Sequence, residues 1–206
     1  MKKYHIYFLV SITLIVVWQY FGSSNNTVRL YISSPLLIVA YIAEHYSELV
    51  RATIVTFIEA VLGLLVVVSL SFVVMVSCFV QPKFLNFILP VMVVSQVIPV
   101  IVLAPFFIIV LGIGISSKIA MAAVISFFPI FISLVQGYKA ISKQIHELMQ
   151  IYKAPLGFRI FRVYIPLAMP SLMAGLKVSA TLAVIGSIVA EFTGAKYGIG
   201  KNLFLS

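Results

Sequence analysis

Long apolar runs separated by short charged segments constrain this chain more than any other feature of its sequence. Hydrophobic residues make up 63% of the 206 residues, charged residues make up only 9%, and aspartate is absent. A soluble domain needs roughly a quarter of its residues charged to keep its surface hydrated. A surface as apolar as this one must face lipid, so the sequence predicts an integral membrane protein.

The runs predict an all-α fold, a polytopic membrane helix bundle of about five spans. A span needs about 20 residues to cross roughly 30 Å of hydrocarbon at 1.5 Å per residue. The third run is longer than that and contains three prolines, so we expect it to form a tilted or kinked helix. The predicted spans are residues 5–22, 52–80, 85–111, 118–137 and 166–190.

The chain divides into three parts. Residues 1–24 hold the N-terminal span, and residues 25–51 form an external segment with a partly amphipathic interfacial helix from Pro35 to Val50. Residues 52–206 form a core that contains a loop over residues 138–165. This loop is rich in Lys and Arg, so the positive-inside rule places it in the cytoplasm. We therefore expect a multi-pass protein of the cell membrane with a cytoplasmic N-terminus.

Several classes of function are excluded by composition and motif. The net charge of +9 does not indicate nucleic-acid binding, because the 14 Lys and Arg are scattered between apolar runs. The single cysteine, Cys78, excludes a disulfide framework and a cysteine-based zinc site. No stretch reads G-x-x-x-x-G-K-S/T, so the chain has no phosphate-binding loop for ATP. We expect no cofactor, no metal and no catalytic residue.

The loop over residues 138–165 has a helical pattern. Ser142 can cap a helix start with its hydroxyl group, and Pro155 and Gly157 can end the helix. Polar residues, His146 among them, lie opposite one apolar face made of Ile141, Ile145, Leu148, Met149 and Tyr152. The pattern predicts an amphipathic helix that either docks another subunit or rests on the lipid interface.

This loop resembles that of the transmembrane permease subunits of bacterial binding-protein-dependent ABC importers, of the nitrate, sulfonate and taurine type. Their loop reads E-A-A, three residues, G, nine residues, I-x-L-P. Glu147 begins the match here, Lys153 stands at the glycine position, and Pro166 ends the match without a gap. Other landmarks of the family are Ser33-Ser34-Pro35, Gln96-Val97-Ile98-Pro99, Leu111-Gly112-Ile113-Gly114, Phe127-Phe128-Pro129, and Ala190 to Ala195 followed by Gly198-Ile199-Gly200.

The resemblance implies the fold of a type I ABC importer permease and a set of partners. A separate ABC ATPase subunit would receive the loop as a coupling helix, and an extracytoplasmic solute-binding protein would deliver the substrate. A second permease copy would complete a homodimer. Family members usually carry one more span, so the chain is expected to lack the last one. The implied ATPase-coupling residues are Ile145, Glu147, Leu148, Met149, Tyr152, Lys153 and Pro166.

Lysine at position 153 departs from the family pattern, because the glycine there normally allows a sharp turn between two short helices. A positive φ angle would strain a lysine. Either the turn has moved to Pro155–Gly157, or the loop is weakened.

Four residues are candidates for the translocation path or its gate: Glu59, Gln96, Pro99 and Glu191. A carboxylate at the depth of Glu59 is costly unless it is paired or hydrated. Glu59 therefore lines the path, pairs with Lys177, or lies near the outer headgroups. Lys177 can instead extend its side chain to the cytoplasmic interface. Glu191 either gates the path, contacts the binding protein, or is a helix-end charge near Lys196.

Two other classes of membrane protein remain as alternatives. A small secondary transporter or channel subunit would need coupled ionisable residues or inverted repeats. A membrane-embedded enzyme would need acid and base groups gathered at one interface. The branch resemblance suggests small anions as substrates, namely nitrate, sulfonates or taurine, and related importers carry pyrimidine vitamin precursors.

Overall fold

The computed structural model describes residues 2–24, 33–195 and 197–205, and these residues form helices and turns without any strand. The all-α prediction is therefore confirmed. The chain separates into two compact units, Met1–Arg51 and Ala52–Ser206, each described here by itself. Residues 25–32 of the predicted external segment and Lys196 lie outside the described residues.

The first unit consists of α1 (Lys2–Ser24) and α3 (Pro35–Glu44). The hydroxyl group of Ser34 accepts a hydrogen bond from the Leu37 N–H at 3.4 Å, and proline follows Ser34 in the first turn of α3. The indole N–H of Trp18 donates to the Ser33 carbonyl at 3.1 Å, which joins α1 to the start of α3. The interfacial helix was predicted to reach Val50. Instead α3 ends at Glu44, and the next residue, His45, is no longer helical.

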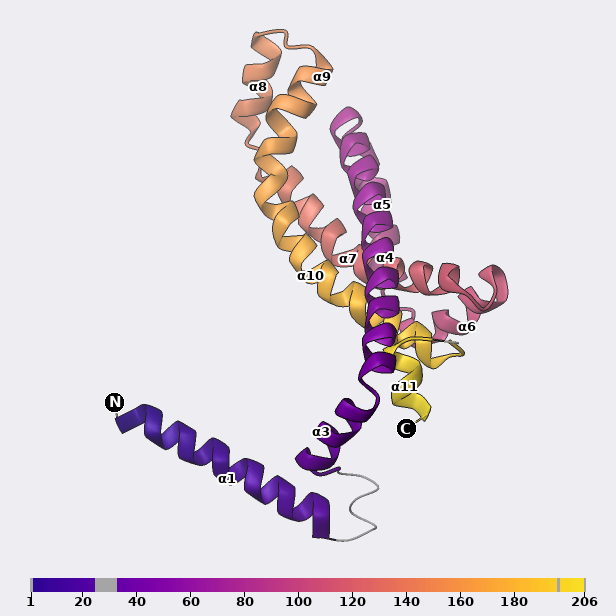
Figure 1. Cartoon of the computed structure of the whole chain (residues 1–206). Coiled ribbons are helices and arrows are strands. Elements are labelled where there is room, and N and C mark those ends of the chain that lie inside the picture. The colour runs from indigo at the N-terminus through magenta and orange to yellow at the C-terminus, as the bar shows by residue number, and fades with distance from the viewer. Residues whose placement is uncertain (1, 25–32, 196, 206) are drawn as a thin grey trace. The chain divides into compact units, whose positions relative to one another are not determined.

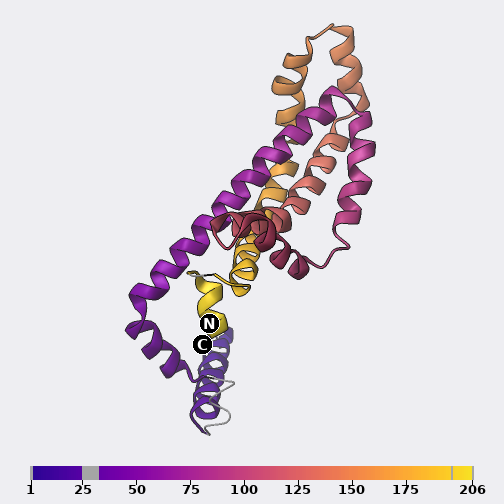
Figure 2. The same cartoon turned by 90° about the vertical axis from the view of Figure 1, so that its right-hand side faces the viewer.

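The second unit is built on three long helices: α4 (Tyr46–Val80), which enters this unit at Ala52, α7 (Ile115–Ala140) and α10 (Ile165–Phe192). The short helices α8 (Lys143–Ile151) and α9 (Leu156–Phe158) lie at one end of α7 and α10. The short α11 (Ile199–Leu205) lies at the other end, as both views show (Figures 1 and 2). Within the described part of the chain, four segments are long and apolar enough to cross a membrane: Tyr4–Ser23, Tyr46–Val80, Ile115–Ala140 and Leu156–Phe192.

The prediction that the third span is a single kinked helix is wrong. It forms two helices, α5 (Lys83–Ser95) and α6 (Val100–Leu111), of 13 and 12 residues. Pro99 has no N–H and its ψ angle is 119°, so α5 cannot continue through it. Neither helix alone reaches roughly 30 Å at 1.5 Å per residue. Gln96 and Pro99 both lie at this break and are exposed.

Small residues bring α7 and α10 into close contact. A Cβ atom added at Gly186 would lie 2.8 Å from the Ala122 Cα, and one at Gly175 would lie 3.1 Å from the Ile130 Cα. The hydroxyl group of Ser179 on α10 donates across this contact to the Ser126 carbonyl at 2.7 Å. Lipid is as apolar as a leucine side chain, so close backbone approach and interhelical hydrogen bonds are what hold such helices together.

We predict that Gly186→Ala destabilises the protein, because the added methyl group would separate α7 from α10. Overpacking of this kind costs about 1–3 kcal/mol. The control is Gly157→Ala, since an added Cβ at Gly157 meets no atom within 4 Å. Thermal unfolding of both variants in detergent measures the difference, and equal melting temperatures would contradict the tight contact.

Candidate functional site

The loop between α7 and α10 begins with α8, whose start lies where the sequence predicts it. Ser142 occupies the cap position with φ −65° and ψ 151°, and its carbonyl accepts from the Ile145 N–H at 3.1 Å. Its hydroxyl group, however, makes no capping hydrogen bond. The expected side-chain cap is therefore wrong, although the cap position is right.

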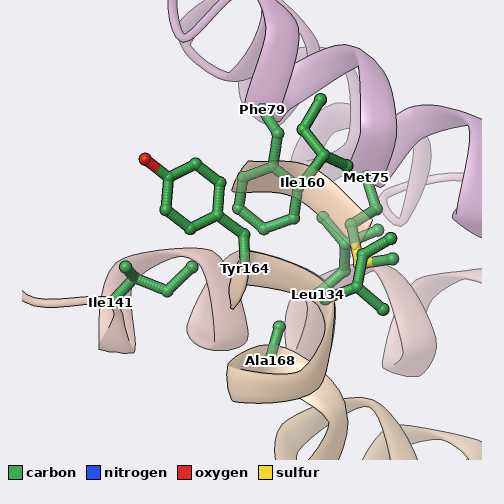
Figure 3. Packing of buried hydrophobic residues seen from close by; sticks show 8 residues of the cluster. Met75, Phe79, Leu134, Ile141, Ile160, Tyr164 and Ala168 are labelled. Carbon is green, nitrogen blue, oxygen red and sulfur yellow. The ribbon is translucent and has the colours of Figure 1, made fainter. Parts of the chain in front are cut away.

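The inner side of α8 is packed against the long helices. Ile145 and Met149 contact a buried cluster drawn from α4, α7, η1 (Arg159–Tyr164) and α10, which Figure 3 shows. The buried members are Met75, Phe79, Leu134, Ile141, Ile160, Tyr164, Ile165 and Ala168. The single apolar face expected for α8 is thus divided, because Leu148 and Tyr152 do not belong to this packed side.

The opposite side of α8 exposes large apolar groups beside charged ones. The exposed fractions are 45% for Leu148, 77% for Ile151 and 74% for Tyr152. Glu147 is exposed among them and pairs with Lys143 at 3.4 Å, one turn earlier. We call Lys143, Gln144, Glu147, Leu148, Ile151 and Tyr152 the outer surface of α8. Sequence reasoning missed Ile151, whose position one turn after Glu147 could have indicated it.

The turn after α8 is at Lys153, where φ is +46°, the one positive φ angle at a non-glycine residue in the described part of the chain. The Lys153 N–H donates to the Gln150 carbonyl at 2.9 Å, and the Ala154 N–H donates to the Met149 carbonyl at 3.1 Å. These two bonds form a Schellman motif with lysine at the position that usually holds glycine. The alternative that the turn has moved to Pro155–Gly157 is therefore wrong.

Glycine at position 153 should stabilise this turn, because a non-glycine residue in the left-handed region costs about 1–2 kcal/mol. We expect Lys153→Gly to slow amide hydrogen exchange at Ala154 by about fivefold, the equivalent of roughly 1 kcal/mol. The β-branched control Lys153→Val should accelerate it. Faster exchange in Lys153→Gly than in the unmodified protein would show that the positive φ angle carries no strain.

After the turn, helical structure continues without interruption into α10. α9 passes into η1 (Arg159–Tyr164), a π-helical turn, and η1 passes into α10, so the segment Leu156–Phe192 is helical throughout. Pro166 lies in the first turn of α10, directly after η1, and because it has no N–H it cannot donate to a carbonyl of the preceding turn. The loop is thereby joined directly to a membrane-spanning helix.

Tyr164 connects α8 to this segment. Its side chain is almost fully buried, and its hydroxyl oxygen accepts hydrogen bonds from the Arg159 Nε and Nη2 atoms at 3.3 and 3.1 Å. Because that oxygen already accepts from Arg159, its own O–H donates to His146 Nδ1 at 2.9 Å. His146, expected on the polar outer face, is instead half-buried against the Tyr164 ring. No spacing pattern in the sequence indicates this contact.

The surroundings of His146 disfavour its charged form. Burial lowers the pKa of His146 below its usual value of 6.5, and the positive charge of Arg159 lowers it further. A neutral imidazole is the form whose Nδ1 can accept from Tyr164. The unfolded chain binds a proton on His146 more readily than the folded chain does. The stability that neutral His146 gives to the fold is therefore fully present above pH 6.5 and is lost as the pH falls below it.

We predict that His146→Gln makes stability less sensitive to acid. The glutamine oxygen can still accept from the Tyr164 hydroxyl group but does not become protonated. Melting temperatures measured from pH 7 to pH 5 should fall less for this variant than for the unmodified protein. His45→Gln is the matched control, and an equal effect of both substitutions would contradict a role for the His146–Tyr164 bond.

A second polar site, a buried charged cluster, lies at the opposite end of the unit. Lys118 on α7 pairs with Glu59 Oε1 on α4 at 2.8 Å, and its ammonium group also donates to the Tyr197 carbonyl at 3.3 Å. The expected alternative pairing of Glu59 with Lys177 is wrong, because Lys177 is exposed on α10. Lys118 is itself buried.

Glu191, the one acidic residue of α10, binds the glycine-rich turn that follows. Its Oε1 atom accepts from the Thr56 hydroxyl group and its Oε2 atom accepts from the Gly200 N–H, each at 2.6 Å. A Cβ atom at Gly198 would overlap the Glu191 carboxyl group, which explains why glycine is required there. Glu191 is therefore a buried anchor for the turn and not a solvated helix-end charge.

The described residues contain no group of three or more His, Cys, Asp or Glu side chains able to hold a metal ion. The unit thus has an exposed, partly apolar surface on α8 at one end and a buried charged cluster at the other.

Comparison with known proteins identifies the family. The family model described as "Binding-protein-dependent transport system inner membrane component" matches residues 75–206. The chain belongs to this family of inner-membrane transport components. The matched residues include the whole α7–α10 loop, Lys118 and Glu191, whereas Glu59 lies before them.

Individual relatives support the same assignment. The chain is 40% identical over 111 residues to the formylaminopyrimidine transport permease protein of Halalkalibacterium halodurans, covering 54% of this chain and 44% of the relative. It is 28% identical over 188 residues to a probable ABC transporter permease protein of Haemophilus influenzae, covering 91% and 76%. It is 24% identical over 194 residues to a putative aliphatic sulfonates transport permease protein of Bacillus subtilis, covering 93% and 70%. The match thus spans less than half of the first relative. The expected resemblance to importer permeases is confirmed.

Proposed function

We propose that this chain is the membrane-spanning permease subunit of an ATP-driven importer, and that the outer surface of α8 docks a separate ATPase subunit. The observation that carries the proposal is the exposure of Leu148, Ile151 and Tyr152 around Glu147 on a helix whose other side is packed. Exposed apolar groups of this size, bordered by charges, are typical of an interaction surface.

The same geometry supports transmission of movement from the ATPase to the membrane. A docking element can move the spans only if it is fixed to them, because a flexible loop would absorb the displacement. α8 is fixed by Ile145 and Met149, which pack on the buried cluster, and by the hydrogen bond between His146 and Tyr164. The continuous helix from Leu156 to Phe192 then carries the movement into the core.

The proposal includes the orientation and the partners. The outer surface of α8 faces the cytoplasm, as does the N-terminus, and ATP hydrolysis takes place on the separate ATPase. A solute-binding protein delivers the substrate on the other side of the membrane, and a second permease copy completes the path. Relatives named for formylaminopyrimidine and for aliphatic sulfonates support a small organic solute as the cargo.

The candidate path and gate residues fall into two groups. Gln96 and Pro99 are exposed at the break between α5 and α6, where non-helical backbone could line a path. Glu59 and Glu191 are buried in the charged cluster beside the glycine-rich turn. We propose that Gln96 and Pro99 border the path, and that Glu59 and Glu191 hold a gate closed. A secondary transporter is disfavoured, because the named relatives include ABC permeases.

The decisive test is a charge reversal on the outer surface of α8. Glu147→Arg should reduce the amount of ATPase that co-purifies with the membrane complex by roughly tenfold or more, since misplaced like charges at an interface cost several kcal/mol. Ile151→Glu should have a similar effect by placing a charge in the apolar part of the surface. ATP hydrolysis stimulated by the binding protein, measured in proteoliposomes, should fall in parallel.

The matched control is Glu44→Arg, the same change of charge at an exposed glutamate on α3. All three variants should insert into membranes as the unmodified chain does. Unchanged co-purification and hydrolysis in Glu147→Arg and Ile151→Glu would overturn the assignment of this surface.

A further inference from the structure

We propose that the end of the second unit nearest α8 has a surface that binds the headgroups of anionic phospholipids. The surface consists of three cations, Lys83, Lys139 and Arg162, and two phenylalanines, Phe158 and Phe161, and all five side chains are exposed. We call it the basic surface. Its partner is the bilayer itself, so the inference goes beyond ATPase docking and does not depend on the transported solute.

The first argument is the position of the three cations at helix ends. Lys83 begins α5, Lys139 lies in the last turn of α7, and Arg162 lies in η1, which passes directly into α10. Both views show these helix ends at the same end of the unit (Figures 1 and 2). About 20 residues suffice to cross the hydrocarbon, whereas the segment Leu156–Phe192 has 37. Its first turns, with Arg162, can therefore lie in the headgroup region.

Two buried clusters hold these helix ends together. Each cation of the basic surface is next in sequence to a residue that packs on one of the clusters. Phe84 and Tyr138 pack on the cluster between α4, α5 and α7, and Tyr138 and Val163 pack on the cluster of Figure 3. Because Tyr138 contacts both clusters, the three charges are attached to one packed end of the unit.

The second argument is an excess of positive charge. Glu147 is the one acidic residue of the sequence between Glu59 and Glu191, and it pairs with Lys143. Within the described residues, no ion pair joins a cation of the basic surface to a carboxyl group. A Lys or Arg at the surface of a bilayer strengthens binding to anionic headgroups by about fivefold. The bilayer can thus supply the negative charge that the chain lacks.

The third argument is the pair of phenylalanines beside Arg162. Phe158 is 51% exposed and Phe161 is 57% exposed, and both lie on a helical segment that continues into the membrane. A helix that exposes phenylalanine next to arginine is typical of an element at the boundary between headgroups and acyl chains. The phenyl rings would enter the acyl region while Arg162 binds a phosphate group. Neither phenylalanine belongs to the outer surface of α8, so lipid and ATPase use different side chains.

The test places one fluorescent reporter on the basic surface. Trp18 is the one tryptophan of the chain, so Trp18→Phe combined with Phe158→Trp moves the fluorescence to this surface. The full chain is reconstituted in phosphatidylcholine vesicles with an equal small fraction of brominated phosphatidylcholine or brominated phosphatidylglycerol. Bromine quenches a nearby indole, so the two samples give the relative binding constant of the anionic lipid.

We expect this constant to favour phosphatidylglycerol by between about fivefold and about 100-fold, for one to three cations that contact the same headgroup. The preference should fall as the salt concentration rises, because salt screens exposed charges.

Variants of the three cations test the role of charge in the same reporter background. Arg162→Gln should lower the preference by about fivefold, and its combination with Lys83→Gln and Lys139→Gln should bring the preference close to one. Arg162→Lys keeps the charge and should keep most of the preference. The matched control is Lys177→Gln, at an exposed lysine roughly 22 Å farther along the helix, which should leave the preference unchanged.

Three results would each overturn the proposal. Equal quenching by the two lipids would show that the surface does not select anionic headgroups. A preference that survives all three substitutions would place the lipid site elsewhere. No quenching by either lipid would show that the reporter lies outside the membrane, on a surface that faces water or a protein. The vesicles contain no ATPase, so each of these results leaves the docking assignment of α8 untouched.

Discussion

The close contact between α7 and α10 is the constraint on which both ends of the second unit depend. Gly175 and Gly186 allow the two backbones to meet, and the Ser179 hydroxyl group bonds across the contact. At one end, the loop between these helices can fold back on a buried cluster only because its two ends are held together. At the other end, Lys118 from α7 and Glu191 from α10 reach the same site on α4. One helix pair thus positions the proposed docking surface and a charged cluster at opposite ends of the unit.

The sequence predicted the elements whose signal is local. Apolar runs identified the long helices, and the Glu147-to-Pro166 spacing identified the loop. It did not predict features that depend on residues far apart in the chain. Lys118 and Glu59 are 59 positions apart, and His146 and Tyr164 are 18 apart, so no periodicity connects either pair. The prediction of a single third span was wrong for a different reason. Mean hydropathy over a run does not show where the helix ends, and here the backbone at Pro99 separates two helices.

The outer surface of α8 shows how an amphipathic pattern can contain two apolar sides. Hydrophobic spacing alone placed Ile145, Leu148, Met149 and Tyr152 on one face. In the structure, Ile145 and Met149 are packed while Leu148 and Tyr152 are exposed. A helix that must be fixed on one side and must bind on the other needs apolar residues around most of its circumference. The sequence signal for such a helix is therefore broader than that of a helix lying on lipid.

The π-helical turn η1 has a consequence for the direction in which the loop faces relative to α10. Arg159 and Tyr164 are five positions apart, and the wider winding of a π-helix is what brings such a pair onto one side. In an α-helix, with 3.6 residues per turn, the same pair would point about 140° apart. A π-helical turn holds one residue more than an α-helical turn, so removing one residue here and restoring α-helical winding would leave the loop facing almost the same way relative to α10. Removing a residue from an α-helical turn would instead rotate the loop by about 100°. The wide turn η1 thus accommodates one extra residue between the loop and α10 without changing the direction in which Glu147 and Ile151 face.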